Sequence, residues 1–114
     1  DLQGVMKKMG RPWEIGKAFE QSAPMGPLYP ASRIGHPEAG RIEMKVNGEQ
    51  KQIGDLNQMI WKVPEMINYL SDYYELAPGD LIMSGTPAGV GPIVRGDVMV
   101  GTVEGVGEFR CEVI

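Results

Sequence analysis

Residues 84–91 have the composition of a loop that can bind an anion. They read Ser-Gly-Thr-Pro-Ala-Gly-Val-Gly, and glycines of this kind allow the backbone to approach a ligand closely. Thr86 adds a hydroxyl near the start of the loop, and a hydroxyl can donate a hydrogen bond to a carboxylate. A plain connection between a strand and a turn has a similar composition. The loop alone therefore does not identify a binding site.

Two further segments contain residues suited to chemistry. Residues 16–19, Gly-Lys-Ala-Phe, place the single lysine Lys17 among glycine and apolar residues. An ammonium is a compact positive charge that can hold a substrate oxygen. Gln3 lies near the start of the sequence, and its amide can donate and accept hydrogen bonds at once. A surface lysine near a turn and an exposed helix glutamine are the structural alternatives for these two residues.

Six motifs, taken in order, resemble the second half of the fumarylacetoacetate hydrolase family. Each is weak by itself, but their order along all 114 residues makes the resemblance specific. The stretches at 12–19 and 55–62 are most similar to bacterial fumarylpyruvate hydrolases of gentisate breakdown. The motifs are Asp-Leu-Gln at 1–3, Gly-Arg-Pro-Trp at 10–13 leading into 16–19, Asn-Gly-Glu at 47–49, Asp-Leu-Asn-Gln-Met-Ile-Trp at 55–61, Pro-Gly-Asp-Leu-Ile at 78–82, and the loop at 84–91.

This resemblance implies a β-rich α+β fold, a mixed β-roll or sandwich with one main amphipathic helix. Residues 1–114 would then be the C-terminal part of a single catalytic domain. Because the sequence opens inside a motif, we expect an N-terminal part of the same polypeptide to precede it. The resemblance also implies a homodimer.

The activity that the resemblance implies is hydrolysis of the carbon–carbon bond of an acylpyruvate, a 2,4-dioxo acid. The substrate would be fumarylpyruvate, cleaved to fumarate and pyruvate in aromatic-compound catabolism. Lys17 would support the charge of the leaving enolate, and Gln3 would orient water or a substrate oxygen. Gly85 and Thr86 would receive the substrate carboxylate. The alternatives are an oxaloacetate decarboxylase or dioxo-acid isomerase on the same scaffold, and a non-catalytic β-rich assembly module.

The family's divalent metal, Mg²⁺ or Mn²⁺, is held by a Glu-x-Glu pair and a later Asp, all upstream of the matched region. The family's water-activating His-Glu pair also lies upstream. No Glu-x-Glu occurs among the 15 acidic residues of this sequence. We therefore assign no metal ligands to this chain, and we expect the ligands in the N-terminal part.

Charge and composition exclude several classes of partner. The net charge is −4, and residues 46–114 contain four Lys/Arg against ten Asp/Glu. Nucleic-acid binding needs clustered cations, so we expect none. Membrane association is also not expected, because no apolar run approaches the ~18 residues of a membrane span. With no signal peptide in this sequence, the expectation is a cytoplasmic protein that binds a small dicarboxylate or oxo acid.

Four residues that attract functional assignments lie outside these motifs or have a simpler role. His36 lies in a Gly-His-Pro segment, and we expect it to be a loop residue. Cys111 is the only cysteine, which we place on the buried face of a strand. Arg11, within the second motif, and Arg33 are possible carboxylate partners by charge alone.

The pattern of the first half predicts a helix, a loop-rich path and a hairpin. Apolar residues at helical spacing predict a helix over residues 1–9, ended by Gly10. Proline and glycine are frequent over 10–40, which favours a ligand-lining path with short strands. Alternation over 41–46 and 49–53, joined by Asn-Gly, predicts a two-residue hairpin. We expect this hairpin to be a solvent-exposed ribbon outside the active site.

The second half is predicted to contain one main helix followed by strands. Apolar residues recur at helical spacing from about 57 to 74, so we predict one helix that bends at Pro64. Short strands are predicted at 81–83, 98–103 and 108–114, each introduced by glycine turns.

Overall fold

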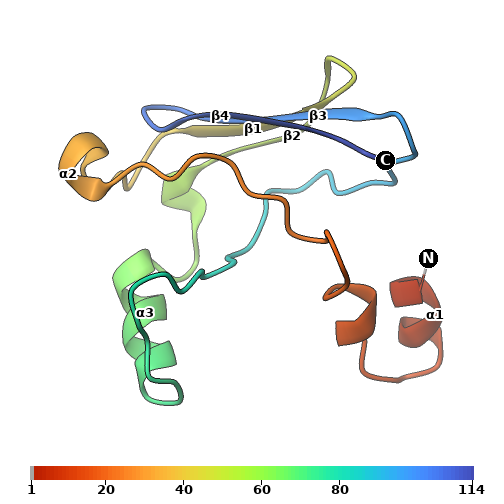
Figure 1. Ribbon diagram of the computed structural model, residues 1–114, viewed down its shortest axis with the longest axis horizontal. Coiled ribbons are helices and arrows are strands. Elements are labelled where there is room, and N and C mark those ends of the chain that lie inside the picture. The colour runs from red at the N-terminus through yellow and green to blue at the C-terminus, as the bar shows by residue number, and fades with distance from the viewer. Residues whose placement is uncertain (1) are drawn as a thin grey trace.

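A computed structural model describes residues 2–114, and its main feature is an antiparallel sheet. The described residues form four strands in the order β2-β1-β3-β4 (Figure 1). The strands are β1 (Arg41–Val46), β2 (Glu49–Asp55), β3 (Val98–Val103) and β4 (Gly107–Glu112). The predicted β-rich fold and its last two strands are confirmed.

Short helices precede and connect the strands of this sheet. They are α1 (Leu2–Lys8), the 3-10 helix η1 (Glu14–Gly16), α2 (Ala31–Ile34), the 3-10 helix η2 (Leu56–Gln58) and α3 (Val63–Ser71). In Figure 1, α3 and α1 extend from the same side of the sheet at opposite ends. None of the helices described for residues 2–114 has the length and apolar character needed to span a membrane.

The hairpin forms as predicted, but it is not a free ribbon. Asn47 and Gly48 have φ of 51° and 84°, the positive values that this turn requires. However, β1 also pairs with β3, from Ile42↔Val103 to Val46↔Met99. The prediction of an exposed ribbon was wrong because alternation predicts a strand but not the number of its neighbours.

The turn of this hairpin is tied to the start of β3. Asn47 Nδ2 donates to Asp97 Oδ1 at 2.7 Å, and the Val94 amide donates to Asp97 Oδ2 at 2.8 Å. The Val94 hydrogen bond, followed by that of Asn47, lowers the pKa of Asp97 from its ordinary 3.8. These contacts lie at one end of the sheet and hold its turns together.

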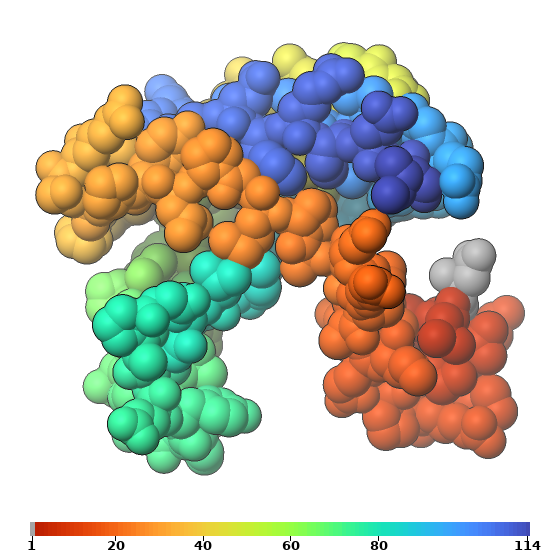
Figure 2. All heavy atoms as spheres, viewed as in Figure 1, coloured from red at the N-terminus to blue at the C-terminus, as the bar shows by residue number. Residues whose placement is uncertain are grey.

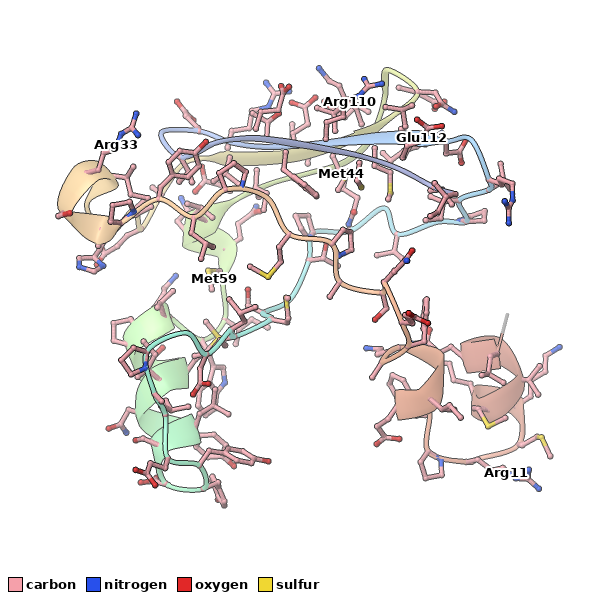
Figure 3. The ribbon with its side chains drawn as sticks, viewed as in Figure 1. Arg11, Arg33, Met44, Met59, Arg110 and Glu112 are labelled. Atoms are coloured by element: carbon pink, nitrogen blue, oxygen red, sulfur yellow. The ribbon has the colours of Figure 1, made fainter. Side chains whose placement is uncertain are left out.

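The two faces of the sheet differ in chemistry. Along β4, Phe109 and Cys111 are half-buried and alternate with the exposed Arg110 and Glu112. Figure 3 shows Arg110 on the outer side of the sheet and Met44 on the side of the helices. The predicted position of Cys111 on the inner face is confirmed, although its side chain is only half-buried.

The predicted long helix at 57–74 is interrupted. Asp55 caps η2 by accepting from the Asn57 amide at 2.9 Å, and the chain then leaves the helical conformation at Met59, where ψ is 125°. Helix α3 begins again at Val63, with Pro64 in its first turn. A proline inside a continuous helix removes a hydrogen bond and clashes with the preceding turn, whereas the first turn tolerates it. The apolar residues therefore do lie at helical spacing, but the prediction of one continuous helix was wrong.

Other predictions for the first and middle parts have mixed outcomes. The first helix is confirmed within the described residues, and Gly10 follows it with φ of 61°. Residues 10–40 contain two short helices rather than short strands. Residues 81–83 form no strand, because they have no ladder partner within 2–114. Apolar extended residues cannot form a ladder without a partner.

The inner side of the molecule leaves much apolar surface open. The accessible surface is 9260 Å², whereas a compact monomer of this length has about 6,200 Å². No residue of the described part is fully buried, and Ile60 is 94% exposed. Figure 2 shows open space between the lobe near the N-terminus and the lobe around α3. Apolar side chains in this arrangement are available to pack against further protein.

Candidate substrate-carboxylate site and lysine site

The loop at 84–91 lies against strand β2. Gln52 Nε2 donates to Thr86 Oγ1 at 2.8 Å and to the Pro87 carbonyl oxygen at 2.6 Å. Thr86 is exposed and Pro87 half-buried. The loop that the sequence indicated is thus held in place by a strand that the sequence placed outside the site.

Glycines make this close contact possible. A Cβ at Gly54 would lie 3.0 Å from Pro87 Cγ, and a Cβ at Gly89 would lie 2.0 Å from the Lys51 carbonyl oxygen. Gly89 also has φ of 103°. The register of β2 shifts beside Lys51, since Met44 pairs with Gln52 but Lys45 with Gln50. This bulge occurs where the Lys51 carbonyl approaches the loop.

We expect Gly89→Ala to destabilise the protein by about 1–3 kcal/mol, because the new Cβ meets a backbone oxygen and the φ is strained for a side chain. Gly91→Ala is the matched control, since a Cβ there has nothing within 4 Å. Urea unfolding of the complete protein measures both variants. Equal unfolding midpoints for the two would contradict this contact.

Thr86 borders two cavities. One has a volume of about 460 Å³ and is lined in part by Asp55, Trp61, Gly85 and Thr86. The other, of about 270 Å³, is mainly apolar and includes Gln52 and Thr86. The two loop residues predicted to receive a carboxylate therefore face a cavity together, and their role in binding remains a prediction.

The segments that carry the second predicted group, Gln3 and Lys17, lie side by side because α1 packs on η1. A Cβ at Gly16 would lie 2.8 Å from the Gln3 backbone nitrogen, so glycine permits the contact. Lys17 follows η1 directly. Its Nζ lies 5.1 Å from the centroid of the Trp13 ring, and Lys7 Nζ lies 4.8 Å from the same ring. Cation–π attraction at these distances favours defined positions for both ammonium groups.

The described residues do not join these two groups into one site. Neither cavity described above is lined by Gln3 or Lys17. Figure 2 shows open space between the lobe near the N-terminus, which contains Gln3 and Lys17, and the lobe around α3. Within residues 2–114, the candidate site therefore consists of two separate parts.

The described residues do not fit a metal centre. Between residues 2 and 114, no three His, Cys, Asp or Glu side chains are grouped to hold an ion. The first motif begins at Asp1, which lies outside the described residues. We therefore derive no catalytic step through a metal from this chain.

The remaining candidates do not line the cavities. His36, Arg11 and Arg33 are exposed and line neither cavity. Arg33 Cζ lies 5.8 Å from the Tyr29 ring centroid instead. The residue that sequence reasoning missed is Gln52. The sequence carried no signal for it, because a two-residue turn without a bulge would pair Met44 with Lys51, and only the bulge pairs Met44 with Gln52.

The sheet, the glycine-rich loop and the lysine segment together define a member of a known family. The family model described as fumarylacetoacetate (FAA) hydrolase C-terminal matches residues 1–114, and the chain belongs to this family.

Particular relatives include both hydrolases and tautomerases. A crystal structure of fumarylpyruvate hydrolase from Pseudomonas aeruginosa in complex with Mn²⁺ and pyruvate superposes with a TM-score of 0.93 at 54% identity, covering 100% of this chain and 49% of that chain. The fumarylpyruvate hydrolase of Ralstonia sp is 44% identical over 99% of this chain and 58% of its own length. An oxaloacetate tautomerase of Escherichia coli (strain K12) is 43% identical over 92% of this chain and 48% of its own length. The chain thus spans about half the length of the curated relatives it matches.

Proposed function

We propose that residues 1–114 are the C-terminal part of the catalytic domain of an acylpyruvate hydrolase that cleaves fumarylpyruvate to fumarate and pyruvate. The observation that carries this proposal is the 54% identity to the Pseudomonas aeruginosa fumarylpyruvate hydrolase over the whole chain. The arrangement of Gln3 beside Gly16 and of Thr86 on a cavity supports it.

The reaction needs an activated water and a stabilised leaving group. Water adds its oxygen to the acyl carbon next to the bond that breaks, and the electron pair of that bond leaves with the pyruvate enolate, which then takes a proton. Lys17 supplies a positive charge for the oxygen on which negative charge develops. The Gln3 amide orients water or a substrate oxygen without changing its protonation state. Thr86 and the Gly85 backbone hold the substrate carboxylate.

A second half of the domain completes this site in our proposal. The open apolar surface and the two separate parts of the site both favour a further segment of the same polypeptide between them. That segment would supply the ligands of a divalent metal, Mg²⁺ or Mn²⁺, and the residues that activate water. The homodimer remains a prediction.

A second activity is supported by a specific relative. The Escherichia coli oxaloacetate tautomerase is about as similar to this chain as the Ralstonia hydrolase, at 43% against 44% identity. Tautomerisation also passes through an enolate, which the same Lys17 would stabilise. It needs no water as a reactant, so the products separate the two reactions.

The test is to incubate the complete enzyme with Mn²⁺ and fumarylpyruvate and to follow loss of the enol absorbance. We expect fumarate and pyruvate in equal amounts. Conversion of oxaloacetate between its enol and keto forms, without cleavage of fumarylpyruvate, would favour the tautomerase. No turnover of either substrate would favour the non-catalytic assembly module.

A further inference from the structure

Gln52 makes two hydrogen bonds to the candidate carboxylate site with one nitrogen. Its Nε2 lies 2.8 Å from Thr86 Oγ1 and 2.6 Å from the Pro87 carbonyl oxygen. The side chain comes from β2 and is half-buried, whereas the loop it contacts is more than 30 residues away, with a separation of 34 for Thr86.

The chemistry of the second contact determines the direction of the first. A backbone carbonyl oxygen only accepts hydrogen bonds, so the Gln52 atom at Pro87 must be the amino group. The amide NH₂ group has two hydrogens to donate and cannot accept a hydrogen bond. The Thr86 oxygen therefore accepts from Gln52, which leaves the hydroxyl hydrogen of Thr86 to donate elsewhere.

From this geometry we propose that Gln52 is a positioning residue that commits the Thr86 hydroxyl to donate its hydrogen to a substrate carboxylate. This inference rests on the proposed function, because it assumes that Thr86 faces an anion. A carboxylate only accepts hydrogen bonds. The Thr86 hydroxyl already accepts one from Gln52, so its hydrogen is oriented to donate to such a carboxylate.

The loop has other contacts that would keep its position without Gln52. Pro87 packs against Gly54, and Gly89 lies against the Lys51 carbonyl. Loss of the Gln52 amide should therefore change the direction of the Thr86 hydroxyl more than the position of the loop. This separates a positioning role from a structural one.

A double-mutant cycle in the complete enzyme tests the inference. The probe is pyruvate, with Mn²⁺ at saturation, and the measurement is calorimetric binding. Gln52→Met keeps the side-chain length and removes the amide, and we expect it to weaken pyruvate binding about tenfold. In the Thr86→Val background the same replacement should have almost no further effect, because the hydroxyl it directs is absent.

Two further variants sharpen the test. Gln52→Glu places a group that only accepts beside the hydroxyl, so binding should weaken more than in Gln52→Met. Gln50→Met is the matched control, because Gln50 is exposed on the same strand and its Oε1 accepts from Arg41. It should leave pyruvate binding unchanged.

The outcomes distinguish this inference from the proposed function. Equal effects of Gln52→Met with and without the Thr86 hydroxyl would overturn the positioning role. Pyruvate binding without turnover of fumarylpyruvate would overturn only the hydrolase proposal. The double-mutant cycle would still test the positioning role of Gln52, because it measures pyruvate binding. A parent enzyme that binds no pyruvate would overturn the inference together with the carboxylate role of Thr86.

Discussion

Replacement of Lys17 by alanine in the complete enzyme is expected to lower kcat for fumarylpyruvate about a hundredfold or more. This is the scale of losing one preorganised group that stabilises charge in the transition state. The structure adds a reason for preorganisation, since Lys17 Nζ lies 5.1 Å from the Trp13 ring centroid and its segment packs on α1. Initial rates at saturating substrate measure the effect.

Lys7→Ala is the control for this result. Lys7 Nζ lies 4.8 Å from the same ring, so the variant removes an equal charge from the same aromatic neighbour. We expect it to retain nearly full kcat. Far-ultraviolet circular dichroism should be the same for both variants. If Lys17→Ala kept the parent rate, or if the two lysines had equal effects, Lys17 would be a surface residue held by Trp13.

Replacement of Thr86 by valine is expected to lower kcat/KM by about 5- to 150-fold. Valine keeps the shape and removes the hydroxyl, and a hydrogen bond to a charged group contributes about 1–3 kcal/mol. Because Thr86 is exposed and borders a cavity, we expect the loss in substrate binding rather than in folding stability. Steady-state kinetics and thermal unfolding measure the two separately.

Thr86→Ser is the matched variant, because it keeps the hydroxyl that Gln52 contacts. It should retain most of the parent kcat/KM. A different pattern would indicate a structural loop. In that case Thr86→Val would lower the melting temperature by many degrees and leave KM unchanged, and the carboxylate would have to bind at Arg11, Arg33 or the N-terminal part.

Local chemistry was sufficient to predict much of the fold. The positive φ of Asn47 and Gly48 follows from their residue types, and alternation around them predicts strands. The helix ending near Gly10 and the position of Cys111 on the inner face of its strand follow from equally local rules. The order of the motifs identified the family for the same reason, because each motif is contiguous in sequence.

The errors occurred where a local pattern permits more than one arrangement. Apolar spacing across Pro64 is compatible with one bent helix or with a 3-10 turn followed by a separate helix, and the backbone at Met59 decides for the second. The apolar residues 81–83 are suited to a strand, but a strand also requires a partner with free backbone groups. The sequence of the segment does not show whether such a partner strand is available.

The sequence by itself determined which residues are suited to the chemistry: a lysine among apolar residues, an amide near the start of the sequence, and a threonine in a glycine-rich loop. Only the tertiary structure decided their surroundings. It placed Gln52 on Thr86 across 34 residues, packed Gln3 against Gly16, and left these two groups separate within residues 2–114. The physical reason is that a turn or a helix end depends on the conformation of adjacent residues, whereas these contacts depend on sheet register, on a bulge at Lys51 and on the absence of a Cβ at three glycines.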